Sequence, residues 1–508
     1  MRSVDARSGE ARSAAFPEAT AADVAAAAEA AAAAAPALAQ LAPAQLAALL
    51  RDIASRIVGL GDELLQVADA ETALGLPRLT GERGRTEWQL EAFARLLESG
   101  EHLEAVIDPR DPEAAPVARP DIRRAQVPVG PVVVFSASNF PFAFSVAGGD
   151  TASALAAGCP VIVKAHPSHP ETSELVAGAV GAAVAAAGLP SGAFSLLHGA
   201  STETGSALVR APEVEAVGFT GSFQGGRALF DAAAARPRPI PVYAEMGSAN
   251  PLFVSAAALA VRAAAIADGL AASFTLGVGQ FCTKPGLVFV PGREAADTMA
   301  SGLAARVAEA EPQTMLNDKL LSGLQTRLAE TTKVAGVRVE AAGGAQGRTV
   351  LPAVVAVDLD TLETNPGVGE EHFGPVVVIV ACDDEGAVLR AAGGLEGNLT
   401  ATIHAEPTDG PWAADLAAIL QSKVGRIVWN GFPTGVAVTD AMVHGGPYPA
   451  TTAPATTSVG LAAIKRFLRP VAWQEAPDDL LPPALQDANP LHIRRKVDGV
   501  WTDAAVVR

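Results

Sequence analysis

Apolar residues follow two different periods along the chain. In the first hundred residues they recur at helical spacing over 20–60 and 87–97, with breaks at Gly75, Pro77, Gly81 and Gly84. From about Val127, short β-branched runs alternate with alanine-rich helical stretches. The expected strands are 127–135, 160–164, 194–198, 215–220 and 241–246, and the expected helices are 150–157, 172–187, 202–209 and 225–235. Strands separated by helices in this way indicate right-handed βαβ units and a parallel sheet.

The alternation continues after about Met246 with different content, which predicts a second α/β domain. Its expected helices are 257–276 and 319–334, and its expected strands are 286–290, 376–382 and 426–430. The segment 115–124 is rich in proline and arginine and suits an extended hairpin. The tail after Lys465 has many prolines and no clear period, so it is either a wrapping arm or a poorly ordered end.

Length and composition agree with a multidomain globular protein. A chain of 508 residues is too long for one hydrophobic core, and 49% apolar with 18% charged residues is not the profile of a disordered chain. No stretch predicts a membrane span: the alanine run 25–35 contains Glu29, ends at Pro36 and suits a surface or half-buried helix. The first residues lack the apolar run of a leader, so we expect a cytoplasmic protein.

Charge and cysteine content exclude several partners. With 37 basic and 55 acidic residues, the net charge of −18 argues against nucleic acid or an anionic membrane, but not against a small anionic substrate. The three cysteines, Cys159, Cys282 and Cys382, include no CxxC pair, and the eight histidines are scattered without ligand spacing. We therefore expect neither a disulfide framework nor a metal site, and most of the cysteines are expected to be small buried hydrophobes.

Three segments carry side chains suited to catalysis. Cys282, in GQFCT between a helix and a strand, lies where a loop exposes a thiol, although a buried structural cysteine is the alternative. Glu245 ends an apolar strand, where a carboxylate can act as a general base; a cap or a solvent-facing glutamate is the alternative. Asn139 follows a strand, and its amide can stabilise an oxyanion or simply form an Asx turn.

Two further segments suit a nucleotide. GFTGSFQGG, at 218–226, follows a strand and opens a helix, so its backbone amides can face a diphosphate. It is not the usual GxGxxG fingerprint. Lys164 ends the strand VIVK, where its ammonium group can meet ribose hydroxyls or a phosphate; a lysine that snorkels to solvent is the alternative.

Taken in order, these segments resemble the motif series of the aldehyde dehydrogenase superfamily over nearly the whole chain. The series is Asn139, Lys164, Gly221 with Ser222, Glu245, Cys282 and EEHFGPV at 370–376. The resemblance implies an α/β protein with a Rossmann-type cofactor domain, an α/β catalytic domain and a small oligomerisation hairpin and arm. The corresponding ranges are 1–114 with 134–245, then 246–445, then 115–133 with 446–508.

The resemblance also implies a role for each motif residue. Cys282 attacks the aldehyde and forms a thioester, the Asn139 amide and the Cys282 backbone N–H hold the oxyanion, and Glu245 activates the hydrolytic water. The implied cofactor is NAD or NADP, without a metal. Its expected contacts are Glu371 and Phe373 at the nicotinamide ribose and ring, Gly221 and Ser222 at the pyrophosphate, and Lys164 at the adenosine ribose.

Departures from the family pattern bear on the cofactor. Many members that prefer NAD have a glutamate three residues after this lysine, where this chain has Pro167 and no carboxylate before Glu171. Lys164, with His166 and His169 nearby, is therefore expected to accept a 2′-phosphate, so the chain leans toward NADP. Two milder departures are Ser248, in place of the second glycine after the base, and Ser138, in place of a tryptophan.

Other motifs, among them GERGRT (81–86), VYAEMGS, MVHGGPYPAT and RFLRPVAWQ, resemble one branch of the superfamily. This branch contains the α-ketoglutaric semialdehyde (2,5-dioxovalerate) dehydrogenases and is close to bacterial NADP-dependent fatty aldehyde dehydrogenases. The implied reaction converts 2,5-dioxopentanoate to 2-oxoglutarate, with a medium-chain or fatty aldehyde as the alternative substrate. Lys284 is one candidate contact for a substrate carboxylate, although a structural lysine is the favoured alternative. The aromatic residues Phe142, Phe144, Phe281 and Phe432 suit a fatty aldehyde equally.

Two rival functions remain open. One transfers the acyl group to coenzyme A, against which the retention of Glu245 argues. The other is a non-catalytic structural protein on the same fold, which has little reason to keep Cys282, Glu245 and Asn139 together. The family also implies a homodimer or homotetramer that is built through the hairpin and the region 466–473.

Overall fold

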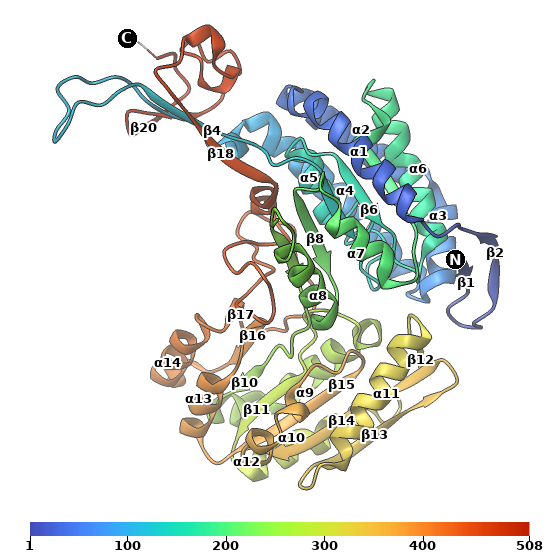
Figure 1. Ribbon diagram of the computed structural model, residues 1–508. Helices are drawn as coiled ribbons and strands as arrows, with labels where there is room; N and C mark the ends of the chain where they lie inside the picture. The colour runs from blue at the N-terminus through green and yellow to red at the C-terminus, as the bar shows by residue number, and fades with distance from the viewer. Residues whose placement is uncertain (507–508) are drawn as a thin grey trace.

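The computed structural model describes residues 1–506 as a two-stranded N-terminal hairpin and three larger sheets, with helices packed around the first two of these larger sheets (Figure 1). The helices at the N-terminus and the first sheet form one body, in blue to green. The second sheet and its helices, in yellow to orange, form another. The third sheet extends away from both. This arrangement confirms the predicted α/β class with two α/β bodies and a separate hairpin and arm.

The first sheet is entirely parallel, in the order β7-β6-β5-β8-β9. Its strands are β5 (Val132–Phe135), β6 (Val161–Lys164), β7 (Phe194–Leu197), β8 (Ala216–Thr220) and β9 (Val242–Glu245). Its helices are α5 (Gly149–Ala156), α6 (Pro170–Ala186), α7 (Thr202–Arg210) and α8 (Phe223–Ala234). Every residue of β5 is buried, as expected for a central strand covered on both faces. The predicted βαβ alternation is confirmed here strand by strand.

Four helices precede this sheet: α1 (Ala21–Ala39), α2 (Pro43–Gly59), α3 (Gly61–Thr72) and α4 (Leu76–Ser99). A hairpin of β1 (Arg2–Val4) and β2 (Ala11–Ala15) begins the chain. The expected breaks at Gly81 and Gly84 are wrong, because α4 runs through both. Pro77 lies in the first turn, where a backbone N–H is not needed, and a Cβ at either glycine would meet only open space. The buried face of α4 outweighs the cost of two glycines, about 1 kcal/mol each.

The second sheet has the order β12-β14-β15-β11-β10-β16-β17, with β13 paired to β14. Its strands are β10 (Leu252–Val254), β11 (Leu287–Pro291), β12 (Gln313–Thr314), β13 (Arg338–Gln346), β14 (Thr349–Asp358), β15 (Val376–Cys382), β16 (Asn398–His404) and β17 (Val424–Trp429). Its helices are α9 (Ala256–Thr275), α10 (Arg293–Val307), α11 (Asp318–Lys333), α12 (Leu359–Thr364), α13 (Glu385–Gly394) and α14 (Gly410–Leu420). The second α/β domain is thus confirmed, although β10, β13, β14 and β16 were not predicted.

The third sheet joins the hairpin to the tail, in the order β18-β4-β3-β19-β20. Its strands are β3 (Val106–Asp108), β4 (Ile122–Pro128), β18 (Leu468–Gln474), β19 (Arg495–Val497) and β20 (Val500–Thr502). Because β18 pairs along the whole of β4, the tail is the wrapping arm, the first of the two alternatives. The predicted arm ends with residues 507–508, which lie outside the described residues.

A buried ion pair fixes the start of the arm. Arg466 Nη2 lies 2.7 Å from the Asp150 Oδ1 atom at the start of α5, and the Arg466 side chain is 1% exposed. Removing one partner of a buried pair leaves an uncompensated charge, at a cost of about 3–5 kcal/mol. The pair holds the chain after residue 458 against α5.

Two helical stretches, Ala21–Ala39 and Ala256–Gly279, are long and apolar enough to cross a membrane by length and composition alone. Core helices of soluble proteins pass the same test. Both stretches bury residues in the cores of the first two bodies, among them Ala28, Ala31 and Leu38 of α1 and Ile266, Leu270 and Phe274 of α9. The absence of a membrane span stays a prediction.

Candidate active site

The loop that presents Cys282 has an unusual backbone. Gly277, Val278 and Gly279 all have positive φ, at 55°, 61° and 64°. A β-branched residue rarely adopts this conformation, so packing around Val278 must impose it. Gly279 is needed for a second reason: a Cβ there would lie 2.3 Å from the carbonyl carbon of Gly374. The glycine of GQFCT therefore packs directly on the glycine of EEHFGPV.

Asn250 holds the other side of this loop. Its Nδ2 atom donates to the Cys282 carbonyl at 2.8 Å and to the Lys284 carbonyl at 2.9 Å, and its Oδ1 atom accepts from Ser248 Oγ at 2.9 Å. The residue is 1% exposed. Sequence reasoning missed this role, although a polar residue before Pro251 at the start of a buried strand was a usable signal. Asn250 thus links the thiol loop to the turn after Glu245.

His444 lies between the predicted nucleophile and the predicted base. Its Nε2 atom is 3.0 Å from Cys282 Sγ, and its Nδ1 atom is 3.3 Å from Glu245 Oε2 and 3.0 Å from Ser458 Oγ. Burial disfavours the charged imidazole, but the negative charges of Cys282 and Glu245 outweigh burial and raise the pKa of His444 to about 10. The site therefore stores a positive charge beside the thiol. Sequence reasoning missed His444, because nothing in its spacing distinguished it from the seven other histidines.

Glu245 ends β9, where the sequence placed it, and is 4% exposed. Its backbone carbonyl accepts from the Gly221 N–H at 3.0 Å, and the next N–H, of Met246, donates to Ala450 O at 2.7 Å. The segment around Ala450 runs antiparallel to the end of β9 through the bridge between Glu245 and Thr451. Glu245 is thus held from both sides, and its carboxylate faces His444.

Asn139 is buried next to the thiol loop. Its Nδ2 atom donates one hydrogen bond, to the Gln280 carbonyl at 2.8 Å, and its own carbonyl accepts from Arg78 Nη2 at 2.6 Å. Within residues 1–506, the second amide proton of Asn139 and the backbone N–H of Cys282 have no hydrogen-bond acceptor. Two donors therefore remain free for an oxygen atom bound at Cys282.

The predicted pyrophosphate and adenosine contacts lie at the carboxyl ends of β8 and β6, which flank the central strand β5 of the first sheet, at the edge where α/β proteins bind nucleotides. Gly221 and Ser222 lie between β8 and α8, where exposed Ser222 caps the helix by accepting from the Gly225 N–H at 3.2 Å. Lys164 ends β6. Burial lowers the pKa of Lys164 to about 8, and the charge of Glu18 opposes this change. These positions fit a dinucleotide, with amides at a helix N-terminus and a cation next to them.

The predicted nicotinamide contacts come from the turn before β15. Glu371 lies against Gly247, since a Cβ on Gly247 would come within 2.4 Å of Glu371 Oε2. Burial raises the pKa of Glu371 to about 7, and the charge of Lys284 opposes this change. Phe373 is half-buried two residues further on. Ser248 replaces only the second of the two glycines. Gly247, which leaves the space that the Glu371 carboxylate occupies, is kept.

The structure does not offer Lys284 to a ligand. Its Nζ atom is buried and donates to the carbonyls of His372 at 3.0 Å and Val376 at 2.7 Å. Burial lowers its pKa to about 8, against the influence of Glu371. This arrangement matches the alternative of a structural lysine rather than a cation that binds substrate. The ammonium group links the thiol loop to the segment that carries Glu371.

The four aromatic residues expected at a pocket are split by the structure. Phe142 is 1% exposed and packs in the core with Leu79 and Phe93, and its place on the pocket wall stays a prediction. Phe432 packs against Gly269 of α9 and the His404 ring, 5.2 Å away. Phe281 and Phe144 remain near the thiol: Phe281 lies next to Cys282, and the Phe144 ring is 6.0 Å from the His444 ring.

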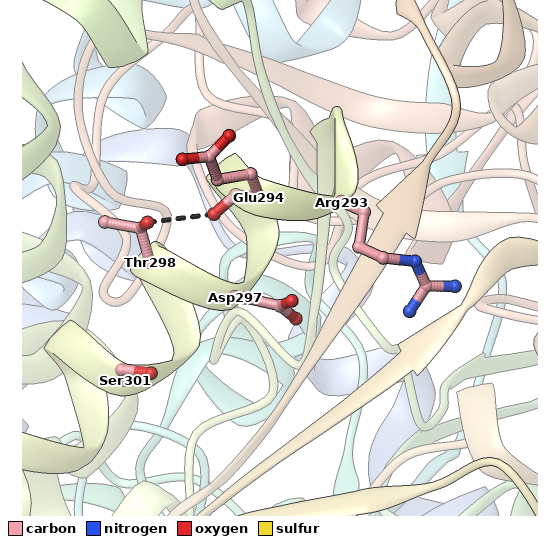
Figure 2. Close-up of a pocket in the computed structure, with 5 residues that line it drawn as sticks. All are labelled: Arg293, Glu294, Asp297, Thr298 and Ser301. Carbon is pink, nitrogen blue, oxygen red and sulfur yellow. Dashed lines mark hydrogen bonds between the residues drawn. The ribbon is translucent and has the colours of Figure 1, made fainter.

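A separate hollow of about 650 Å³ lies along α10 (Figure 2). Its lining residues are Arg293, Glu294, Asp297, Thr298 and Ser301, all on that helix. Figure 2 shows Thr298 turned back to its own helix, where its hydroxyl donates to the Glu294 carbonyl at 2.8 Å. None of the five belongs to the Cys282 site.

Comparison with known proteins agrees with this geometry. The family model described as "Aldehyde dehydrogenase family" matches residues 3–448. The chain belongs to the aldehyde dehydrogenase family. It is therefore an oxidoreductase of the aldehyde group, in a family that uses NAD(P).

Two curated relatives are similar to this aldehyde dehydrogenase over most of its length. Alpha-ketoglutaric semialdehyde dehydrogenase 2 of Azospirillum brasilense is 52% identical, over 89% of this chain and 87% of the relative. Alpha-ketoglutaric semialdehyde dehydrogenase of Acinetobacter baylyi is 47% identical, over 90% of this chain and 87% of the relative. Among solved structures, aldehyde dehydrogenase 21 of Physcomitrella patens, in complex with succinate, has a TM-score of 0.80 at 22% identity, over 95% of this chain and 96% of that one. The last similarity shows the fold alone.

The His444 contact gives a first prediction. Because the imidazole stays positive below its pKa of about 10, it places a positive charge 3.0 Å from the Cys282 sulfur. We expect His444→Asn to slow alkylation of Cys282 by iodoacetamide at least about tenfold near pH 7, with the rate recovering as pH rises. Mass spectrometry of the modified peptide measures the rate.

Two features make this experiment clean. Burial raises the pKa of Cys159 to about 11 and that of Cys382 to about 12, so neither should react with the reagent. His404→Asn, which removes a buried histidine that contacts Arg262, is the matched control and should leave the rate unchanged. Equal rates in His444→Asn and the unmodified protein would show that the contact does not activate the thiol.

Proposed function

We propose that this aldehyde dehydrogenase oxidises 2,5-dioxopentanoate (α-ketoglutaric semialdehyde) to 2-oxoglutarate by a cysteine thioester, with NADP as the favoured cofactor. The observation that carries the chemistry is the line from Cys282 Sγ through His444 to Glu245, with contacts of 3.0 and 3.3 Å. The substrate is supported by the two relatives at 52% and 47% identity, which are named for this activity.

In the first step the Cys282 thiolate adds to the aldehyde carbon. The His444 imidazolium, 3.0 Å from Sγ, stabilises the thiolate before attack. The new C–S bond places negative charge on the former aldehyde oxygen. The free N–H groups of Asn139 and Cys282 then donate to that oxygen.

NAD(P), when bound, would supply the hydride acceptor. Glu371, next to Gly247, would hold the nicotinamide ribose, Ser222 and Gly221 the pyrophosphate, and Lys164 the adenosine ribose. The side chain of Lys284 positions Glu371 indirectly, through the carbonyls of His372 and Val376 on that turn. These residues orient the cofactor relative to Cys282.

Hydrolysis then releases the acid. Glu245 takes a proton from the water that attacks the thioester carbon, and the C–S bond breaks to return the Cys282 thiolate, which His444 again stabilises. Overall, the aldehyde, NAD(P)⁺ and water give the carboxylate, NAD(P)H and two protons. A transfer to coenzyme A would not need this base, which favours water as the acceptor.

Replacing Glu245 tests the hydrolytic step. We expect Glu245→Gln to give a burst of about one NAD(P)H per Cys282 followed by turnover at least about a hundredfold slower, because the thioester forms but water is not deprotonated. Stopped-flow absorbance of NAD(P)H measures both phases. Cys282→Ala is the control and should give no burst. Release of an acyl-coenzyme A as the main product of the unmodified enzyme would contradict a hydrolytic mechanism.

A substrate panel tests the proposed aldehyde. We expect kcat/KM to be highest for 2,5-dioxopentanoate among 2,5-dioxopentanoate, glutaraldehyde, succinic semialdehyde and medium-chain aldehydes, because the relatives named for this substrate share about half of the sequence. Initial NAD(P)H formation gives the values, with each cofactor in turn. A higher kcat/KM for medium-chain aldehydes would favour the fatty aldehyde alternative.

The NADP preference is supported by charges near Lys164. Glu171, the first carboxylate after Pro167, is engaged by Arg12 at 3.1 Å. The positive charges of Lys164 and Lys319 both act on the half-buried His166 ring, so two cations lie near this corner, with Glu18 as the opposing charge. A 2′-phosphate would meet a net positive potential.

This gives a prediction on pH and cofactor. Because the pKa of Lys164 is about 8, its charge is present below this pH and is lost above it, so kcat/KM for NADP should fall from about pH 7 to about pH 9 more steeply than kcat/KM for NAD. Lys164→Met should lower the NADP-to-NAD ratio of kcat/KM at least about tenfold. A preference for NAD of about a hundredfold in the unmodified enzyme would overturn the proposal.

We also propose a homo-oligomer in the cytoplasm, either a dimer or a tetramer, with no nucleic acid or membrane partner. The support is the third sheet, which projects from the body together with the loop between β3 and β4 (Figure 1). Its edge strand β20 exposes Val500 and Trp501, at 66% and 53%. Exposed apolar residues on an unpaired edge favour a contact with another chain.

A further inference from the structure

One face of α4 carries three charged residues that reach the segment after β5. Arg78, Glu82 and Arg85 are spaced four and three residues apart, so they lie on the same side of the helix. Arg78 Nη2 donates to the Asn139 carbonyl, and Glu82 Oε1 accepts from the Phe142 N–H at 2.8 Å and the Ala143 N–H at 3.0 Å. Helix α4 therefore forms a wall next to the residues that surround Cys282.

Arg85 is the member of this face without a polar partner. Its Nε, Nη1 and Nη2 atoms are all buried, and none has a hydrogen-bond acceptor within residues 1–506. Over the same residues no carboxylate comes within ion-pair distance of it, Glu82 included. A buried guanidinium without acceptors is expensive, since burying a charge costs much more than burying a neutral polar group. The chain tolerates this cost where a ligand supplies the missing acceptors.

Arg85 is also close to the reacting sulfur. Its guanidinium carbon lies 4.9 Å from the centre of the Phe144 ring, this ring is 6.0 Å from the His444 ring, and His444 is 3.0 Å from Cys282 Sγ. Burial lowers the pKa of Arg85, and the charges of Glu82 and Cys282 oppose this change. A ligand bound at both residues is therefore a short molecule.

Arg426, on β17, is a second cation whose charge acts on Cys282. Its Nη1 and Nη2 atoms donate to the carbonyls of Gly435 and Pro433, at 3.2 and 2.6 Å, which fixes the guanidinium. Its Nε atom is buried and has no acceptor within residues 1–506. Arg85 comes from helix α4 and Arg426 from strand β17, yet both leave donors unused near the same thiol.

We propose that Arg85 binds the carboxylate at the far end of a short ω-oxo acid substrate, with Arg426 Nε as an additional donor. The inference rests on the proposed function and identifies the residue that selects its substrate class. A carboxylate oxygen pair matches the donor geometry of a guanidinium, and pairing removes the cost of burying Arg85. An unsubstituted alkyl aldehyde of the same length would leave Arg85 without acceptors, so a site built for a polar group rejects the analogue that lacks it.

Glu82 lies on the same face of α4 as the two arginines. Its charge acts on both Arg78 and Arg85, and burial raises its pKa. One carboxylate shared between two guanidinium groups leaves a net positive charge. Glu82 therefore leaves part of the positive charge at Arg85 unneutralised.

The test compares two aldehydes that differ only at the far end. 5-Oxopentanoate and pentanal both have five carbons, but only the first carries a carboxylate. For Arg85→Met we expect the ratio of kcat/KM for 5-oxopentanoate over pentanal to fall about a hundredfold, and Arg85→Lys to keep part of it. In Arg85→Met, kcat/KM for 2,5-dioxopentanoate should fall as kcat/KM for 5-oxopentanoate does.

A matched control lies on the same helix. Arg83 donates to the Gly61 carbonyl at 2.7 Å, outside the site, so Arg83→Met should leave the ratio unchanged. A second readout uses a dicarboxylate that is not itself oxidised. Glutarate should inhibit pentanal oxidation in the unmodified enzyme, and Arg85→Met should weaken this inhibition at least about tenfold. Turnover of pentanal by Arg85→Met also shows that the variant is folded.

The outcomes separate this inference from the proposed function. A ratio that is unchanged in Arg85→Met, or an equal loss for both aldehydes, overturns the role of Arg85 and leaves the proposed substrate standing. If the unmodified enzyme favours another oxo acid over 2,5-dioxopentanoate but Arg85→Met still loses the ratio, the proposed substrate is wrong and the carboxylate site is supported. If the unmodified enzyme favours pentanal and glutarate does not inhibit it, the carboxylate site itself is wrong.

Discussion

A charged imidazole buried between a thiol and a carboxylate is the contact on which the rest of the site depends. His444 comes from the segment after the second sheet, Cys282 from the loop before β11, and Glu245 from the end of the first sheet. Burying a positive charge is unfavourable unless negative partners meet it, so the three segments must close on one another. The same segment then follows β9 through Thr451 and returns to α5 through Arg466. One ionic contact thus determines how the last part of the chain packs on both bodies.

Close packing explains two of the glycines in the family motifs, one against main chain and one against a side-chain carboxylate. Gly279 of the thiol loop lies against Gly374, and Gly247 after the base lies against Glu371. In both cases a side chain would separate the residues that act on the aldehyde from those that are proposed to hold the nicotinamide. Lys284 adds a third connection between the same two segments. The thiol loop and the turn before β15 therefore behave as one unit, in which the spacing between nucleophile and cofactor is a property of the backbone.

Local patterns were sufficient for the elements whose burial is uniform. The β-branched strands of the first sheet and the strand-end positions of Glu245 and Lys164 follow from runs such as VVVF and VIVK. The pattern failed where packing overrides local preference: α4 passes through Gly81 and Gly84, and β16 carries Asn398, Thr400 and Thr402 in the interior. These polar strand residues are satisfied by partners far away in sequence; Asn398, for example, accepts from the backbone of Ala249 and Asn250. No window of neighbouring residues contains that information.

The same limit applies to the site. The motifs of Cys282, Glu245 and Asn139 implied a role for each residue. Arg85 and His444 also lie in motifs, GERGRT and MVHGGPYPAT, but these implied no role, and the roles of Arg85, His444 and Asn250 follow only from what lies next to them in space. The position of Arg85 has a mechanical consequence. Its helix packs with the N-terminal body, while the thiol belongs to a loop of the second body, so a ligand held at both ends spans the two. Such a ligand works as a removable crosslink between the two bodies, and its conversion to product places a second negative charge next to the thiolate end of that link.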